Sequence, residues 1–396
     1  MTQSVFLVGN GYNLFLRDYY RERDIELSRA IERTCNLWDS FANTLSPLVG
    51  EAPRPVAREI HDNNLNSEQT AQLLYDMLDF ATGMQAFTTN TSLRKRVGMS
   101  GCTHVCVDSL ESLLDSTLHK IIRQFMDDEA HGIYGRLFSA ASPGDLPSLQ
   151  GLFSSIRDRT SLFTTNYDGL FDITLGFEGF QPEGNGFAYK DGFGNVDDLS
   201  GLYFPSPNSA SGNLEHGLRA HLHGSYKFIQ ERTTEGFRMC RKIRQSEYSD
   251  LDVLLSEAVP VLVFDAPSRK RSRIDRFPVL MTYYAAFEHT LLRASTLVIF
   301  GQSLANDPHL SATIWSNWID SHDGVTRPNG GSTNATTTRR LVVVDKDPDA
   351  VLATLAGSRG FTADQLACRL DYRPVSTASV ASIDLVVDSL KPLLTE

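Results

Sequence analysis

The sequence predicts an α/β fold with a mainly parallel sheet that helices cover on both faces. Short apolar runs rich in Val, Ile and Phe recur along the chain, and segments with helical periodicity separate them. Continuous apolar runs of this kind are typical of strands whose two faces are both buried. The chain has 396 residues, 41% of them hydrophobic, so it can bury a large core in two or three subdomains.

The first strand is expected at residues 5–8, and a glycine-containing turn follows it. From residue 14 to residue 152 the apolar positions recur at three- and four-residue spacing, which indicates helices. We therefore expect a large helical insertion at 14–152, with residues 1–13 and 153–396 forming the sheet-containing core. A separate all-helical domain is the less favoured alternative, because the first strand precedes these helices.

Further strands are expected after the insertion. They are placed at Ser161–Phe163, Leu218–Leu222, Pro260–Phe264, Thr296–Phe300 and Arg340–Val344. Two connections are rich in Gly, Pro, Ser and Asn. Residues 176–217 are expected to form a lid or oligomer contact, with plain disorder as the alternative, and residues 323–338 a surface linker.

Composition argues against several classes of protein. The net charge is −11 and no long Lys/Arg block is present, so direct nucleic-acid binding is not expected. The short basic run 269–273 is interpreted as a solvated loop, with a phosphate or nucleic-acid contact as the alternative. No apolar run could cross a membrane, no signal peptide is recognisable, and five scattered cysteines form no disulfide pattern, which predicts a cytoplasmic protein. Cys102 and Cys106 lack a second cysteine pair, so no metal is expected.

Polar side chains gather where two of the expected strands end. Asn166 and Asp168 follow one strand, and His223 follows the next. Open α/β sheets bind ligands at this edge, and residues two apart can face one crevice. The alternative for the Asn/Asp pair is an Asx-type turn before a helix. His223 is the candidate base because imidazole takes up protons near neutral pH, whereas His221 is expected to be a hydrogen-bonded structural residue.

Three other positions carry weaker signals. Glycines 9 and 11 stand at a strand-to-helix turn, where they suit either a phosphate cradle or a tight turn. Asp345 ends the last expected strand and could bind ribose hydroxyls or lie in a surface turn. Asp307 precedes a Pro at an expected helix start and is interpreted as a cap.

Taken together, four segments resemble the SIR2 (sirtuin-type) NAD-binding fold, a Rossmann-like core. They are most similar to bacterial SIR2-like proteins of anti-phage defence, and the first and last are also similar to AbiH-type abortive-infection proteins. The segments are Val8-Gly9-Asn10-Gly11, Thr164-Thr165-Asn166-Tyr167-Asp168, His221-Leu222-His223-Gly224-Ser225 and Gly301-Gln302-Ser303-Leu304.

The resemblance implies a role for each matched residue. Asn166 would orient a water or a ribose hydroxyl, Asp168 would hold the nicotinamide carboxamide, and His223 would be the catalytic base. The remaining positions that we expect to contact NAD+ are Gly9, Asn10, Gly11, Asn13, Thr165, Gly301, Ser303 and Asp345. Asn10 and Thr165 differ from the Ala and Gln of sirtuins, which leaves the details of nucleotide contact open.

We therefore expect an NAD+ glycohydrolase (NADase) that releases nicotinamide and ADP-ribose. As an abortive-infection effector it would deplete NAD+, with control by homo-oligomerisation or by a partner such as a HerA-type ATPase. The alternatives are an NAD-dependent deacylase or ADP-ribosyltransferase, a nuclease component of a defence complex, and a non-catalytic nucleotide-sensing scaffold. The missing zinc ribbon weakens deacylation, and no carboxylate cluster points to a nuclease.

Overall fold

The computed structural model divides the chain into two compact units. The larger unit comprises residues 1–35, 125–263 and 270–396, and the smaller one 36–124 and 264–269. The described residues are 3–35, 119–120, 122–123, 125–127, 145–175, 191, 218–232, 238–243, 245–263, 267–323, 339–378 and 383–395. Every helix and strand given below belongs to the larger unit. Most of the expected insertion lies outside the described residues, as do Cys102, Cys106 and nearly all of the two connections.

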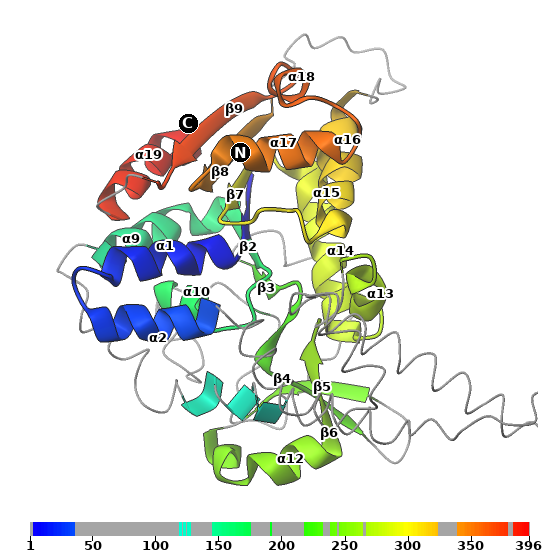
Figure 1. Cartoon of the computed structure of the whole chain (residues 1–396). Helices are drawn as coiled ribbons and strands as arrows, with labels where there is room; N and C mark the ends of the chain where they lie inside the picture. Colours follow the sequence, from blue (N-terminus) through cyan, green and yellow to red (C-terminus); the bar gives the residue numbers. More distant parts are fainter. Residues whose placement is uncertain are drawn as a thin grey trace, which may run out of the picture. The chain divides into compact units, whose positions relative to one another are not determined.

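A six-stranded parallel sheet forms the centre of the larger unit (Figure 1). Its strands are β1 (Ser4–Val8), β2 (Thr160–Thr164), β3 (Arg219–His221), β7 (Thr296–Phe300), β8 (Arg340–Asp345) and β9 (Asp371–Ser376). They lie in the order β3-β2-β1-β7-β8-β9, and every neighbouring pair is parallel. This is the strand order of dinucleotide-binding doubly wound sheets, and it reverses between β1 and β7. The predicted α/β fold with a mainly parallel sheet is confirmed.

Two hydrophobic cores, one on each face, explain why the central strands are buried at every position and carry apolar residues on both faces. Val5 and Leu7 belong to one core, whereas Phe6 and Val8 belong to the other, as alternation along a strand requires. The first core is shared by α13 (Lys270–Ile274), α14 (Pro278–Arg293), α15 (Pro308–Ile314), η4 (Trp315–Ile319), α17 (Pro348–Gly357) and α18 (Ala363–Ala367). The second is shared by α1 (Asn10–Tyr20), α2 (Ile25–Cys35), α9 (Asp145–Ile156), α10 (Leu170–Thr174) and α19 (Ile383–Thr395).

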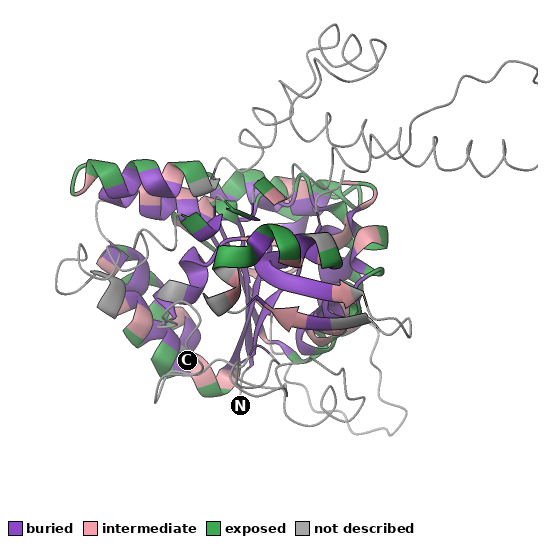
Figure 2. Cartoon of the chain, turned by 90° about the horizontal axis from the view of Figure 1, so that it is seen from below, coloured by how far each residue is buried: buried purple, intermediate pink, exposed green. Residues whose placement is uncertain are grey.

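Buried and exposed residues are distributed as expected for a sheet that helices cover on both faces (Figure 2). The strands β1, β2 and β7 are buried throughout, while the helices expose one side to solvent. Four short elements complete the described helices: η1 (Arg157–Arg159), η3 (Gln245–Asp250), α12 (Leu251–Glu257) and α16 (Asp320–Asp323). Within the described ranges, no helix has the length and apolar character needed to span a membrane.

A second, three-stranded antiparallel sheet corrects the prediction for residues 260–264. It consists of β4 (Gly224–Arg232), β5 (Arg238–Lys242) and β6 (Ala258–Leu262), in the order β5-β4-β6. The strand expected in the main sheet is therefore β6, paired with β4. The chain enters this sheet at Gly224, whose φ of +83° lies in the left-handed region that glycine adopts most readily.

The basic run at residues 269–273 was expected to be a solvated loop, and here too the structure differs from the prediction. Residues Lys270–Ile274 form helix α13, and the Lys270 side chain is 5% exposed. A long-range ion pair with Asp307 explains this burial, because a buried ammonium requires a partner.

Candidate functional site

The loops that follow β1 and β7 pack tightly at the point where the strand order reverses. Gly9 N donates to Phe300 O at 2.9 Å, and Gly11 N donates to Gly301 O at 2.7 Å. A Cβ on Gly9 would lie 1.9 Å from Gln302 Oε1, and one on Gly11 would lie 2.7 Å from Gly301 Cα. The contact between the two loops therefore requires glycine at both positions, and the N–H groups of both glycines donate hydrogen bonds across it.

A chain of side-chain hydrogen bonds crosses from α1 to the segment after β2. Asn13 Nδ2 donates to Asp168 Oδ2 at 2.7 Å. Asn166 Nδ2 donates to Asn13 Oδ1 at 3.2 Å and to Gly9 O at 3.3 Å. Leu170 N donates to Asp168 Oδ1 at 2.9 Å. The structure therefore brings Asn13, Asn166 and Asp168 together, and it also contains the Asx-type turn that was the alternative interpretation.

The Asp168 carboxyl lies in an unusual environment, since its side chain is almost entirely buried. Burial raises its pKa from the ordinary 3.8 to about 6, and the hydrogen bonds from Leu170 N and Asn13 limit the rise. Near neutral pH this group can exist in both protonation states. It is ionised above about pH 6 and then offers two acceptor oxygens to a ligand.

His221 has the structural role that the sequence predicted for it. Its Nδ1 lies 3.0 Å from Asn166 O, and its Nε2 lies 3.2 Å from Asp172 Oδ1. Arg219 Nη1 pairs with the same Asp172 oxygen at 2.9 Å. Burial opposes ionisation of Asp172, but Arg219 and His221 outweigh it and lower its pKa. His221 thereby holds the backbone of Asn166 in place.

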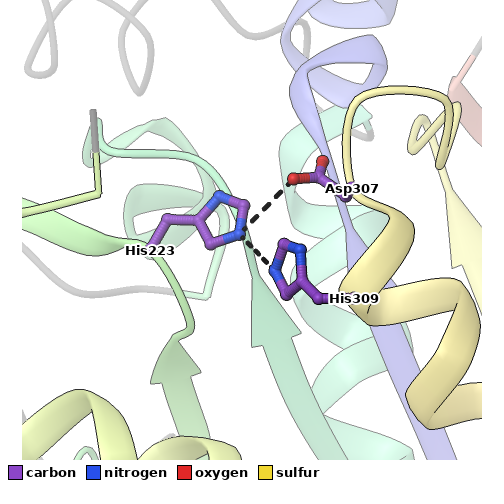
Figure 3. Close-up of side chains that lie close together, drawn as sticks. All are labelled: His223, Asp307 and His309. Atoms are coloured by element: carbon purple, nitrogen blue, oxygen red, sulfur yellow. Dashed lines mark hydrogen bonds and ion pairs between the residues drawn. The ribbon is translucent and has the colours of Figure 1, made fainter. Parts of the chain in front are cut away.

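His223 lies in the turn between β3 and β4 and faces the start of α15 (Figure 3). Its Nε2 is 3.2 Å from His309 Nε2 and 3.6 Å from Asp307 Oδ1. Lys270 Nζ donates to Asp307 Oδ1 at 3.0 Å, and Gln302 Nε2 donates to Asp307 Oδ2 at 2.6 Å. Asp307 precedes α15 as predicted, but its side chain makes no cap hydrogen bond, because both oxygens serve this cluster.

Gln302 connects the His223 cluster with the segment after β2. Its Oε1 accepts a hydrogen bond from Thr165 Oγ1 at 3.0 Å. Thr165 directly precedes Asn166, so one polar network extends along the carboxyl edge of β2, β1 and β7. Four members were not among the predicted site residues: Lys270, Gln302, Asp307, which was interpreted as a helix cap, and His309. The signal for Gln302 was its place inside the Gly301–Leu304 segment, whereas Lys270 and His309 carried none.

The charge state of the cluster is set mainly by burial. Desolvation lowers the pKa of His223 to about 3 and that of His309 to about 4, so both imidazoles are neutral at pH 7. For Asp307, burial favours the protonated form, but His223, Lys270 and His309 outweigh it and lower the pKa. Since the imidazoles are neutral at pH 7, Lys270 is the cation that keeps Asp307 ionised.

Other predicted residues lie at the margin of this network or apart from it. Asn10 and Ser303 are exposed, on either side of the packed loops. Leu304, next to Ser303, is buried at a φ of +62°, a strained conformation that often occurs near functional sites. Asp345 ends β8, and its Oδ1 accepts from Asp347 N at 3.1 Å, which matches the turn interpretation.

No protein-family model matches this chain, and no curated protein shows a significant match to its sequence. The network combines two carboxylates, three amide side chains, one lysine and two neutral imidazoles at the carboxyl edge of a doubly wound sheet. Such groups can orient a polar ligand, accept its hydrogen bonds and take up a proton.

Proposed function

We propose that the protein is an NAD+ glycohydrolase that cleaves NAD+ into nicotinamide and ADP-ribose. One observation carries this proposal: Asn13, Asn166 and Asp168 converge at the carboxyl ends of β1 and β2, next to the point where the strand order reverses between β1 and β7. Sheets with this order bind dinucleotides outside the carboxyl ends of their strands, at that reversal. The four segments that resemble the SIR2 fold meet at the same edge.

The reaction breaks the bond between the nicotinamide nitrogen and C1′ of the ribose. The bond's electron pair moves to the nitrogen, so nicotinamide leaves neutral and needs little acid catalysis. A water oxygen bonds to C1′ and passes its proton to the neutral imidazole of His223, where the Asp307 carboxylate 3.6 Å away stabilises the imidazolium that forms. Asn166 orients this water, and the Asp168 carboxylate accepts a hydrogen bond from the carboxamide NH2 group.

Substrate binding must exchange some hydrogen bonds that the site residues now make with one another. Asp168 Oδ2 accepts from Asn13 Nδ2, so the carboxamide takes the place of that donor or shares the oxygen with it. Asn13 Nδ2 then becomes available to a ribose hydroxyl. This exchange keeps every buried polar group paired, which binding in a buried site requires.

On the resemblance alone, the proposal extends to the biological setting. The protein would act as an anti-phage effector that depletes NAD+, and homo-oligomerisation or a partner such as a HerA-type ATPase would control it. Deacylation and ADP-ribosyl transfer would use the same bond cleavage with a different acceptor. The products therefore distinguish these activities.

The test is NAD+ consumption by the purified full-length chain, with free nicotinamide and ADP-ribose as the measured products. Asn166→Ala and His223→Ala are expected to abolish turnover while circular dichroism shows an intact fold. His289→Ala, at an exposed position on α14, is the matched control and should retain activity. Saturable NAD+ binding without turnover would favour the scaffold alternative. Unchanged NAD+ both in vitro and in phage-infected cells would refute the proposal.

A further inference from the structure

We propose that His223, Asp307 and His309 form a binding site for a divalent transition-metal ion, with zinc as the preferred ion. The three side chains come from two places in the chain, the turn after β3 and the start of α15, and they point toward one another (Figure 3). Each offers one ligand atom, and the three atoms lie within 4.8 Å of one another. Two imidazole nitrogens and one carboxylate oxygen are a ligand set that zinc uses in proteins.

The spacing of the donor atoms fits tetrahedral coordination. Ligands at about 2.0–2.1 Å from a tetrahedral zinc ion lie about 3.3–3.4 Å from one another. The measured separations are 3.2 Å between the two Nε2 atoms and 3.6 Å between His223 Nε2 and Asp307 Oδ1. The third separation, between the ligand atoms of His309 and Asp307, is at most 4.8 Å, so these two side chains must move closer together when the ion enters. Three protein ligands leave the fourth position open to water or another ligand.

Asp307 is held in position for this role by two outer hydrogen bonds. Gln302 Nε2 donates to one carboxylate oxygen, and Lys270 Nζ donates to the other. Each oxygen has two lone pairs, so Oδ1 can bind an ion while Lys270 remains attached. Such outer contacts orient metal ligands in known sites.

Two features predict a site that exchanges its ion readily. The Lys270 ammonium lies close to the bound charge and repels it. His309 Nδ1 has no hydrogen-bond partner among the residues that the structure describes, so the imidazole lacks there the outer contact that usually strengthens ligation. We therefore expect micromolar rather than nanomolar affinity, and removal of the ion by a chelator such as EDTA.

Metal binding has a further consequence, which rests on the proposed function. An ion on His223 Nε2 occupies the lone pair that would accept the proton from water. Zinc should then inhibit NAD+ cleavage, and EDTA should restore it. Binding of the ion at this cluster would thus switch off the activity proposed for the same site.

The test measures binding directly, with the metal-stripped full-length chain titrated with Zn2+ or Co2+. We expect one saturable equivalent per chain and the visible absorption of tetrahedral Co2+. His309→Gln and Asp307→Asn should weaken binding at least about 100-fold, because losing a ligand costs more than losing an outer contact. His289→Gln, the exposed histidine on α14, is the matched control and should bind as the wild type does.

Anomalous diffraction at the zinc edge locates the ion without any variant and covers the case in which a variant fails to fold. No saturable binding, equal binding by all variants, or an ion found elsewhere would overturn the inference. Binding at this cluster without NAD+ turnover in any metal state would leave the metal site standing and count against the proposed function. NAD+ turnover without metal binding would support the proposed function and overturn the metal site.

Discussion

Replacing Gly11 by Ala tests the contact between the two loops on which the whole site rests. A Cβ at this position would lie 2.7 Å from Gly301 Cα and 2.8 Å from Gly301 O. Both are backbone atoms, so no change of side-chain rotamer relieves the overlap. Ordinary Cβ contacts begin at 3.4 Å, and the loops must therefore separate by about 0.7 Å (3.4 − 2.7).

This separation weakens the hydrogen bond between Gly11 N and Gly301 O, which is now 2.7 Å long. A buried backbone hydrogen bond that is lost costs about 1–3 kcal/mol, and the displaced packing adds to it. We expect Gly11→Ala to lower the free energy of unfolding by about 3 kcal/mol. NAD+ turnover should fall as well, because Asn13 lies two residues after Gly11 on α1 and would be displaced with it.

The assay is urea denaturation followed by far-UV circular dichroism, with Gly151→Ala as the matched control. Gly151 lies on α9, and a Cβ there would meet nothing within 4 Å. Alanine is the better helix former, so this control should gain about 0.5–1 kcal/mol. A Gly11→Ala variant as stable as the wild type would refute the close packing of the loops.

Two further predictions concern buried charges. The folded-state pKa of Asp168, about 6, lies above its ordinary 3.8, so its contribution to stability is complete below about pH 4 and is lost as the pH rises through 6. Relative to Asp168→Asn, the wild type should lose about 3 kcal/mol over this range in urea titrations at several pH values; a constant difference would contradict the raised pKa. Arg219→Met should cost about 3–5 kcal/mol, because the buried Asp172 carboxylate loses its arginine, although Asp191 keeps its ion pair with Lys242. Arg271→Met, which breaks two exposed ion pairs and a cation–π contact with Tyr284, should cost about 1–2 kcal/mol in the same measurement, less than Arg219→Met.

Local pattern was sufficient to predict most strands of the main sheet. The apolar runs at β1, β2 and β7 face buried cores on both sides, and such runs stand out in any sequence. Edge strand β9 was missed because its sequence, DYRPVS, is polar and contains a proline that only an edge tolerates. Strand β6 was found but assigned to the wrong sheet, because an apolar run does not specify its pairing partner.

The candidate site also contains some residues that the sequence predicted and others that only the structure revealed. The sequence alone indicated Asn166, Asp168 and His223, because polar groups that end apolar strands meet at one edge of a parallel sheet. Only the tertiary structure brought Asp307 and His309 to His223, across a separation of 86 positions between the two histidines. Such a contact depends on how β3 and α15 pack against each other, and the spacing of residues along the chain does not indicate this packing. The burial of Lys270 could not be predicted for the same reason, since its partner Asp307 is near in space and distant in the chain.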